Sequence, residues 1–416
     1  MMSTHPRILL IGTGDTKSDE MLFMQEQIAL AGAVAVIMDI SILGEPHFTP
    51  AYSKHDVAAA ANTTIEKIAN SGDENSAMAL MAKGASNLAR QICDQGKMDG
   101  MLILGGSMGT DLALDVAAAL PLGVPKFIVS TISFSHFIPP DRISADLMMI
   151  LWSGGLYGLN SICKSVLAQA CGAVVGAANI STRPQTKRPV IGMTSLGKSC
   201  LKYMVALKPE LERRGYEVAV FHTTGMGGRA FESVAAQKGF AAVMDFSLQE
   251  VVNFENGVLA SSSGADRLEN AGRLGIPQIV APGAIDMVDI PAWGALPEKW
   301  QDRPYHAHNR LLGSITTDHD GRRATARSLM SKLAKSKGPV AFILPAAGIQ
   351  EWDQEGEPLH DPEALDVFVA EIRKSIQPPI QFHDIPAHIN SPAFTAKALE
   401  IFDYWVKQGI IPAGTL

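Results

Sequence analysis

ILLIGTGDTK, residues 8–17, is a short apolar run that leads directly into a glycine-rich turn. VIGMTSLGKS, residues 190–199, repeats this arrangement in the second half of the chain. A buried strand followed by such a turn and a helix is typical of parallel α/β sheets. Glycines let the backbone approach a ligand closely, and the first turn of a helix offers unpaired N–H groups and the positive end of a dipole. Both stretches therefore predict sites for small anions.

The composition is that of an ordinary globular chain large enough for two domains. The chain has 416 residues, of which 47% are hydrophobic and 19% are charged, and one hydrophobic core rarely serves that length. A net charge of -7 without a dense Lys/Arg run argues against a nucleic-acid surface. Four cysteines without a CxxC pair, no signal-peptide pattern and no apolar run of about 18 residues indicate a cytoplasmic protein without a membrane partner.

A polar, proline-flanked stretch, RPQTKRP at residues 183–189, is the predicted linker between two domains. Continuous apolar runs separated by helical segments predict sheets that are covered on both faces. We predict two Rossmann-like, doubly wound α/β domains over 1–182 and 190–416, with mostly parallel sheets, a cleft between them and a last helix that can pack back on the first. The predicted strands lie near 8–11, 34–38, 101–104, 126–130, 190, 217–221, 241–245, 276–280, 339–344 and 379–383.

The carboxyl ends of parallel strands meet at one edge of a sheet, where ligands bind. In the first domain two glycine loops at this edge would hold phosphates, and the Lys17 ammonium would neutralise charge. Asp39 ends the second strand, where dinucleotide folds place a ribose-binding acid, but Lys17 replaces the third glycine of GxGxxG, which argues against ordinary NAD binding. The alternative is that the glycines only form tight turns. The predicted ligand-binding residues are Gly12, Thr13, Gly14, Asp15, Thr16, Lys17, Asp39, Gly105, Gly106, Ser107, Gly109 and Thr110.

A glycine run closed by arginine predicts a second anion site in the second domain. TTGMGGR at 223–229 follows a strand, and SSSGADR at 261–267 has the same character. Guanidinium groups bind carboxylates and phosphates through two parallel hydrogen bonds. Glu232, one helical turn beyond Arg229, is either a general base or the ion-pair partner of Arg229. The predicted substrate-binding residues are Thr223, Thr224, Gly225, Gly227, Gly228, Arg229, Ser262, Asp266 and Arg267.

Residues 192–199 also fit the P-loop pattern G-x-x-x-x-G-K-[ST]. In that interpretation Lys198 contacts the β- and γ-phosphates, Ser199 holds Mg²⁺ and Asp245 is a second metal contact. Turns of this kind are common between strands and helices, so a chance match is the alternative.

Acidic and imidazole side chains supply further candidates near the same edge of the second domain. Asp286 and Asp289 are conceivable metal ligands, although carboxylates that cap a loop would give the same pattern. His383 and His388 are candidate general acids or bases because imidazole titrates near neutral pH.

Three of these motifs together resemble a known family. GTGDTK at 12–17, GGSMGT at 105–110 and FHTTGMGGRA at 221–230 are similar to those of an uncharacterised bacterial, fungal and plant family that includes a tomato inhibitor of tobamovirus RNA replication. The resemblance spans essentially the whole chain. It implies a two-domain α/β homodimer that binds ATP in its amino-terminal domain, through the first two motifs. It also implies that the P-loop match is accidental.

We therefore expect an ATP-binding enzyme, with Mg²⁺ as the accompanying ion, that brings the nucleotide together with a small anionic metabolite in the cleft between the domains. Two facing anion sites would suit transfer from a donor to an acceptor. Two alternatives stay open: a nucleotide-dependent interaction protein without catalysis, and an enzyme of nucleotide sugars or sugar acids. No catalytic triad, metal-binding motif or sugar-kinase motif in the sequence identifies the reaction.

Overall fold

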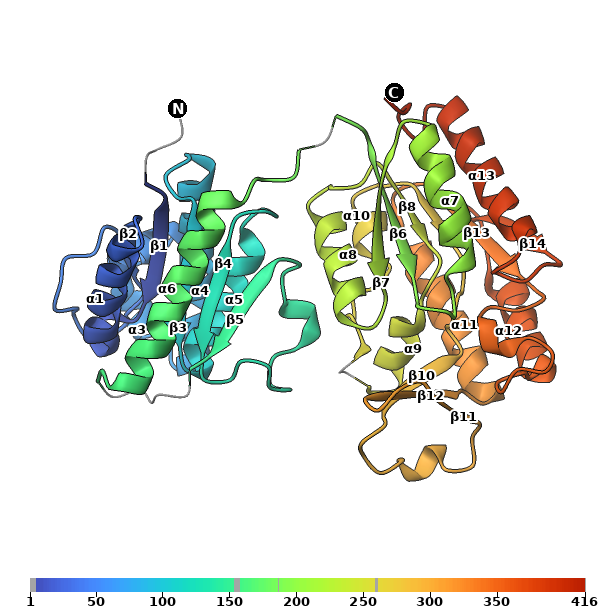
Figure 1. The fold of residues 1–416 in the computed structure, drawn as a ribbon, viewed down its shortest axis with the longest axis horizontal. Coiled ribbons are helices and arrows are strands. Elements are labelled where there is room, and N and C mark those ends of the chain that lie inside the picture. Colours follow the sequence, from blue (N-terminus) through green and yellow to red (C-terminus); the bar gives the residue numbers. More distant parts are fainter. Residues whose placement is uncertain (1–4, 153–157, 186, 259–260, 416) are drawn as a thin grey trace. The chain divides into compact units, whose positions relative to one another are not determined.

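The computed structural model of the protein describes residues 5–152, 158–185, 187–258 and 261–415. The chain forms two compact units, Met1–Pro184 and Gln185–Leu416. Each unit contains a parallel β-sheet with helices on both faces (Figure 1). The prediction of two α/β domains with parallel sheets is confirmed. Residue 186 of the predicted linker lies outside the described residues.

The first sheet has the strand order β2-β1-β3-β4-β5, and every neighbouring pair is parallel. Its central strands are continuous apolar runs because both faces of the sheet are buried. The order reverses between β1 and β3, which is the switch point where doubly wound sheets bind ligands. The strands are β1 (Arg7–Gly12), β2 (Val34–Asp39), β3 (Gly100–Gly105), β4 (Lys126–Ser130) and β5 (Leu147–Leu151).

Helices cover both faces of the first sheet (Figure 1). Ile8 and Leu10 pack with side chains of α1 and α6, whereas Leu9 and Ile11 pack with side chains of α4 and α5. This alternation follows from the two-residue period of a strand. The helices are α1 (Gly14–Leu30), α2 (Lys54–Ala60), α3 (Ile65–Ala69), α4 (Glu74–Asp94), α5 (Ser107–Ala119) and α6 (Ser161–Ile180), and a 3-10 turn spans Pro140–Arg142.

The second sheet repeats this topology with one strand more. Its order is β14-β13-β9-β8-β6-β7, all parallel, so that the switch point lies between β6 and β8. All six strands fall where the sequence predicts them. They are β6 (Val190–Ser195), β7 (Glu217–His222), β8 (Ala242–Asp245), β9 (Gln278–Val280), β13 (Val340–Pro345) and β14 (Gln381–Ile385).

The second sheet is also covered on both faces. Ile191 packs with side chains of α7 and α13, and Phe342 packs with side chains of α11 and α12. The last helix buries Phe394, Phe402 and Trp405 in the core of the second unit. The helices are α7 (Lys202–Arg213), α8 (Met226–Ala236), α9 (Gln249–Glu255), α10 (Asn270–Arg273), α11 (His319–Ala334), α12 (Pro362–Ser375) and α13 (Pro392–Lys407), and 3-10 turns span Glu298–Trp300 and Glu351–Asp353.

A small antiparallel sheet interrupts the second unit between β9 and α11, and the sequence did not predict it. Its order is β10-β12-β11, with β10 (Met287–Pro291), β11 (Tyr305–Ala307) and β12 (Leu312–Thr316). Val288, Ile290 and Ile315 form a small apolar cluster of their own with Val252 of α9. This sheet therefore packs on α9.

One described helix, α6, is long and apolar enough to cross a membrane by length and composition. The sequence analysis found no apolar run of that length. Length and composition are weak evidence for a membrane span, because core helices share both. Cys163, Leu167 and Val174 of α6 are buried against the first sheet.

Candidate functional site

The first turn of α1 already holds a carboxylate of the chain itself. Asp39, which ends β2 and is 1% exposed, accepts hydrogen bonds at Oδ1 from the N–H of Gly14 (2.9 Å) and the N–H of Ser41 (3.0 Å). The Ser41 hydroxyl donates to the same oxygen and accepts the N–H of Asp15 at 3.0 Å. Asp39 therefore caps α1 through Oδ1, and its predicted contact with a ribose stays a prediction.

The other polar side chains of this turn also have partners within the turn or close to it. The hydroxyl groups of Thr13 and Thr16 form a hydrogen bond with 2.9 Å between their oxygens. Lys17 Nζ donates to the carbonyl of Thr16 at 3.3 Å. Asp15 accepts the N–H of Gly44 at 3.1 Å. The structure thus brings the predicted residues of this loop together, but they bind one another.

The first turn of α5, by contrast, is open. The N–H groups of Ser107, Met108 and Gly109 have no hydrogen-bond partner within the described part of the chain. A side chain at Gly105 would lie 2.6 Å from the Cα of Gly109, so glycine is required where β3 turns into α5. Since β1 and β3 are neighbours, both predicted loops lie at the switch point, and the α5 turn is the one that can receive an anion.

The hydroxyl of Thr110, a predicted ligand-binding residue, is bonded within the fold. Its side chain donates to the carbonyl of Gly106 at 2.7 Å and lies 2.6 Å from the hydroxyl oxygen of Ser130, the last residue of β4. These bonds join α5 to β4. The exposed hydroxyl of Ser107 remains at the open turn.

A cavity of about 430 Å³ adjoins the open turn. Its polar lining residues are Ser107, Thr110, Asp111 and Arg142, and Arg142 donates to the carboxylates of Asp111 and Asp115. Its apolar lining residues are Leu114, Ile132, Phe137, Ile138 and Pro139. The sequence analysis missed the segment that follows β4, TISFSHFIPPDR, although aromatic and basic residues directly after a buried strand are the signal that could have identified it.

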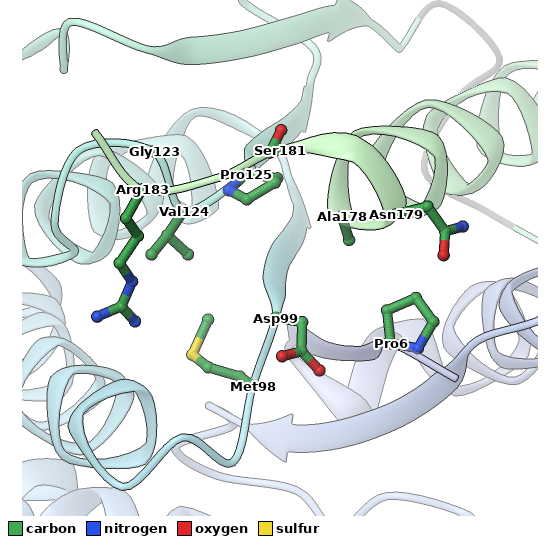
Figure 2. A pocket seen from close by; sticks show the side chains of 10 residues that line it. All are labelled: Pro6, Met98, Asp99, Gly123, Val124, Pro125, Ala178, Asn179, Ser181 and Arg183. Carbon is green, nitrogen blue, oxygen red and sulfur yellow. The ribbon is translucent and has the colours of Figure 1, made fainter. Parts of the chain in front are cut away.

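A second cavity, of about 230 Å³, lies at the opposite edge of the same sheet (Figure 2). Pro6, Asp99 and Pro125, which precede β1, β3 and β4, line it, and so does Arg183. Arg183 donates to the thiol sulfur of Cys93 at 3.0 Å. Because ligands of doubly wound sheets bind at the carboxyl ends of the strands, this cavity is the weaker candidate.

In the second unit the predicted glycine run is again occupied by a carboxylate of the chain. Glu250 of α9 accepts the N–H of Gly225 at 2.7 Å and the N–H of Gly228 at 2.9 Å. A side chain at Gly228 would overlap this carboxylate, which explains the glycine. Glu250 thus occupies two N–H groups of the run, and the binding of a substrate anion there stays a prediction.

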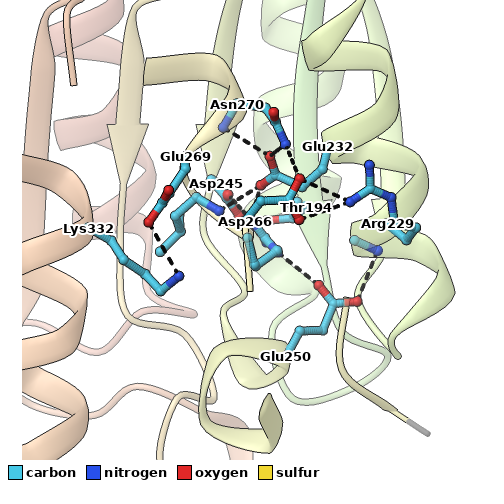
Figure 3. Close-up of polar contacts among 12 residues, drawn as sticks. Thr194, Arg229, Glu232, Asp245, Glu250, Asp266, Glu269, Asn270 and Lys332 are labelled. Carbon is cyan, nitrogen blue, oxygen red and sulfur yellow. Dashed lines mark hydrogen bonds and ion pairs between the residues drawn. The ribbon is translucent and has the colours of Figure 1, made fainter. Parts of the chain in front are cut away.

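Glu250 is one of three buried carboxylates that converge from α8, β8 and α9, as Figure 3 shows for Glu232, Asp245 and Glu250. All three contact the guanidinium of Arg267, which is itself buried. Asp245 also accepts the hydroxyl of Thr194 at 2.8 Å. Arg267 is therefore a core residue that is paired within the fold, and its predicted role in substrate binding stays a prediction.

The surroundings of this cluster shift its titration. Burial raises the pKa of Glu250 to about 7, against the opposing effect of Arg267. Burial likewise raises the pKa of Glu232. For Arg267 burial acts to lower the pKa, but the carboxylates, Asp245 foremost, hold it well above its usual value. One guanidinium among three carboxylates thus leaves a surplus of buried negative charge.

The remaining predicted substrate residues are also engaged. Arg229 pairs with Asp266 at 2.9 Å, and Glu232 accepts the N–H of Leu268 at 2.6 Å, so Glu232 is neither an open base nor the partner of Arg229. Thr223 is buried and lies 2.7 Å from the hydroxyl of Ser247. Of the other residues in the predicted set, Ser262 is buried, and Thr224 and Gly227 are partly exposed.

The P-loop interpretation is wrong. Gly192 lies inside β6, where a side chain would meet Phe231 and Phe240 at 2.9 Å. Leu196 and Cys200 then close a tight turn through two backbone hydrogen bonds, and α7 begins only at Lys202. The chain therefore does not enter a helix at Lys198-Ser199, as a phosphate-binding P-loop must. Asp245, the supposed second metal contact, is held by Arg267.

Two of the acidic and imidazole candidates, Asp286 and His388, have Asp353 as a common neighbour. Asp286 lies beside Arg322, with 3.1 Å between Oδ2 and Nη2. His383 is inside β14, and burial lowers its pKa. His388 is 3.0 Å from the Asp353 carboxylate and accepts the N–H of Asn390. Among the described residues no three His, Cys, Asp or Glu side chains form a metal-binding group.

Asp289, the other predicted metal candidate, is held by neutral donors. It accepts hydrogen bonds from Gln249 Nε2 (2.7 Å), Asn253 Nδ2 (3.1 Å) and Ser314 Oγ (3.0 Å). Burial raises its pKa. These contacts suit a polar network better than a metal ligand.

Comparison with known proteins agrees with the two-unit fold. Residues 6–183 match the N-terminal domain of the uncharacterised protein family UPF0261, and residues 188–406 match its C-terminal domain. A UPF0261 protein of Brucella melitensis is 63% identical over 99% of this chain and 98% of its own length. A UPF0261 protein of Clostridium tetani is 31% identical over 93% of this chain and 96% of its own length.

The chain is also similar to a plant protein and, weakly, to a solved structure. The ToMV resistance protein Tm-1 of Solanum lycopersicum is 28% identical over 96% of this chain, which spans 56% of the plant protein. A solved pyrethroid hydrolase covers 52% of this chain and 97% of its own at 12% identity, with a TM-score of 0.26, too low to support an inference. The resemblance predicted from three motifs is confirmed, and the chain belongs to the uncharacterised protein family UPF0261.

Proposed function

We propose that the first unit binds a nucleotide, ATP, at the open first turn of α5. The observation that carries the proposal is the set of unpartnered N–H groups at Ser107, Met108 and Gly109 beside a cavity of about 430 Å³. That volume lies within the range of roughly 300–1,000 Å³ that small-molecule sites occupy.

The phosphates would lie on the turn. Three N–H groups and the positive end of a 13-residue helix attract negative charge. The hydroxyl of Ser107 would add a donor, and Lys17 lies in the first turn of α1, which follows the neighbouring strand β1. An Mg²⁺ ion accompanying the phosphates would find the carboxylate of Asp111 on the cavity wall.

The base would lie on the apolar wall. Phe137 is 72% exposed beside this cavity, and Leu114 and Ile132 complete an apolar surface. A ligand with an anionic end and a flat apolar end matches a cavity lined by both polar and apolar side chains. Nucleotides have that character, which agrees with the ATP binding that the family resemblance implies.

Ser107→Pro tests the proposal sharply. Proline is well tolerated at the first position of a helix, but it removes one N–H donor and places a ring at the phosphate position. Calorimetry with ATP, with and without Mg²⁺, should show binding weakened at least about tenfold, since a bond to a charged group contributes roughly 1.5–3 kcal/mol. Ser107→Ala keeps the N–H group and should bind more nearly like the wild type.

Two further variants locate the rest of the nucleotide. Phe137→Ala should weaken ATP binding because the contact with the base is lost. Lys17→Ala should weaken ATP binding because a positive charge is lost. If the wild type does not bind ATP, or if Ser107→Pro binds it normally, the proposed site is wrong. Phosphate release in the same preparations distinguishes an enzyme from a protein that only binds the nucleotide.

The family resemblance leads us to propose also that the chain is a homodimer. Sedimentation equilibrium should then give twice the chain mass of 44.4 kDa.

A further inference from the structure

The second unit has a cavity of its own at the switch point of its sheet. The tight turn that follows β6, residues 196–199, forms one wall, and the end of β7 and the small antiparallel sheet form others. The cavity measures about 40 Å³, room for roughly three water-sized groups. It lies where doubly wound sheets bind ligands, and of the predicted substrate-binding residues only Thr224 is among those that line it.

The mouth of this cavity is basic. Lys198, His222 and His308 line it, and all three are exposed. His222 Nδ1 accepts the N–H of Gly197 at 3.3 Å, so the neutral ring carries its proton on Nε2 and can donate it. Burial, aided by His308, lowers the pKa of His222, which favours this neutral form. The lysine therefore supplies the positive charge, and the imidazole supplies a neutral donor.

The inner wall is polar and carries a carboxylate. Asp289, 2% exposed, belongs to the cavity lining together with two of its donors, Gln249 and Ser314. Because the Ser314 hydroxyl donates to Asp289, its oxygen still presents lone pairs that can accept a proton from a ligand. The amide nitrogen of Gln249 has a second hydrogen beyond the one given to Asp289. This wall can thus both accept from and donate to a hydroxyl group.

A flat aromatic side chain completes the cavity. Trp352 lines it and lies against His306, with ring centroids 4.3 Å apart and the rings tilted by 37°. His308 contacts the same indole from 6.2 Å. Such a face suits the C–H groups of a small polyol or sugar-like chain.

These features exclude a strongly charged interior ligand. A phosphate dianion pushed beside Asp289 would meet like charge in a buried place, which is costly. A group that is neutral but rich in hydrogen bonds fits the interior, while a single negative charge fits the mouth at Lys198.

We propose that this cavity binds a small hydroxycarboxylate, with its carboxylate at Lys198 and His222 and its hydroxyl groups toward Asp289, Ser314 and Gln249. The inference concerns the second unit alone and does not depend on nucleotide binding by the first. It assigns a ligand to residues that the glycine-run prediction left out.

Three small probe molecules separate recognition of the carboxylate from recognition of the hydroxyl groups. Glycerate has a carboxylate and two hydroxyl groups, propionate has only the carboxylate, and glycerol has only hydroxyl groups. Ligand-observed NMR and calorimetry on the full chain should show binding of glycerate, with propionate and glycerol each weaker by about tenfold or more.

Two variants assign the halves to residues. Lys198→Met should lower the affinity for glycerate by about tenfold, because it removes the charge at the mouth of the cavity. Ser314→Ala should lower the affinity for glycerate by roughly fivefold, because it removes a contact with a hydroxyl group of the ligand. The weaker binding of propionate, which has no hydroxyl group, should not change. Lys407→Met, on the exposed end of α13, is the matched control and should bind glycerate like the wild type.

The inference is overturned if glycerate does not bind, if it binds no better than propionate, or if Lys198→Met binds it normally. ATP titrations keep the two proposals apart. Ser107→Pro should leave glycerate binding intact, and Lys198→Met should leave ATP binding intact. Loss of ATP binding in Lys198→Met would overturn the nucleotide assignment to the first unit, whereas loss of glycerate binding alone supports the cavity proposed here.

Discussion

The Glu250 carboxylate accepts the N–H of Gly225 at 2.7 Å, so a side chain of the protein itself occupies the glycine-rich turn where an external anion was expected. Asp39 does the same in the first unit, where it accepts the N–H of Gly14 at 2.9 Å. In both places the glycine-rich turn has the property that the sequence predicts, an affinity for carboxylate. The carboxylate comes from within the fold, and this makes both turns structural.

The titration of Glu250 should make the stability of the second unit depend on pH. Its pKa in the folded protein is about 7 against an ordinary value of 4.5, so between these values the folded state binds more protons than the unfolded state. The free energy of unfolding should therefore fall as pH rises from about 4.5 to 7, by at most about 3 kcal/mol from this group. Urea unfolding followed by tryptophan fluorescence measures it, since Trp300, Trp352 and Trp405 belong to this unit.

Glu250→Gln is the control for that dependence. The amide oxygen can still accept the N–H groups of Gly225 and Gly228, but the side chain no longer titrates. The variant should show a flatter dependence of stability on pH across the same range. An equal slope in the two proteins would contradict the assignment of the titration to Glu250.

Asp39 should affect folding rather than ligand recognition. Asp39→Ala leaves the N–H groups of Gly14 and Ser41 without their acceptor in a buried place, at a cost of about 3 kcal/mol. Asp39→Asn keeps an oxygen in position and should cost only about 1 kcal/mol. Differential scanning calorimetry measures both, and the Asn variant should bind ATP like the wild type. A ribose-binding Asp39 would give the reverse, with normal stability and weakened ATP binding.

Two glycines of the first unit should respond to alanine in opposite directions. A methyl group at Gly105 would lie 2.6 Å from the Cα of Gly109, so Gly105→Ala must move α5 away from β3. We expect a loss of roughly 1–3 kcal/mol and a weakened ATP site. Gly172 lies in α6 with open space around its Cα, and Gly172→Ala should stabilise the unit by about 0.5–1 kcal/mol. Thermal unfolding compares the two, and equal effects would contradict the packing at Gly105.

The sequence predicted the parallel sheets well because buried parallel strands are apolar along their whole length. β3 and β13 are buried at every residue, and such runs stand out without any alignment. The small antiparallel sheet was missed; its strand β11 has three residues of intermediate or full exposure and therefore no apolar run to detect, whereas β10 and β12 are mostly buried. Both sheets have the same strand order over their first five strands, with a switch point beside the first strand.

The candidate sites were predicted only in part, and the reason is again physical. Sequence patterns identify a helix turn that attracts an anion, but they do not show which anion fills it. Glu250 follows Gly225 by 25 residues, and Asp39 follows Gly14 by 25 residues, so only the fold brings them together. The cavity at Lys198 combines the ends of two strands with the small antiparallel sheet, and a missed sheet concealed it.

Arg267 supplies the decisive test of a structural role against a ligand-binding role. Arg267→Met leaves Glu232, Asp245 and Glu250 without their common cation, at a cost of roughly 3–5 kcal/mol. The loss should shrink at acidic pH, because protonation removes the repulsion among the three carboxylates. Arg214→Met breaks surface pairs with Glu210 and Asp403 and should cost about 1 kcal/mol or less, which makes it the matched control. Urea unfolding at pH 5 and pH 7.5 compares both variants with the wild type. If Arg267→Met instead folds with wild-type stability, its guanidinium is free to bind a ligand and the buried cluster does not hold the second unit together.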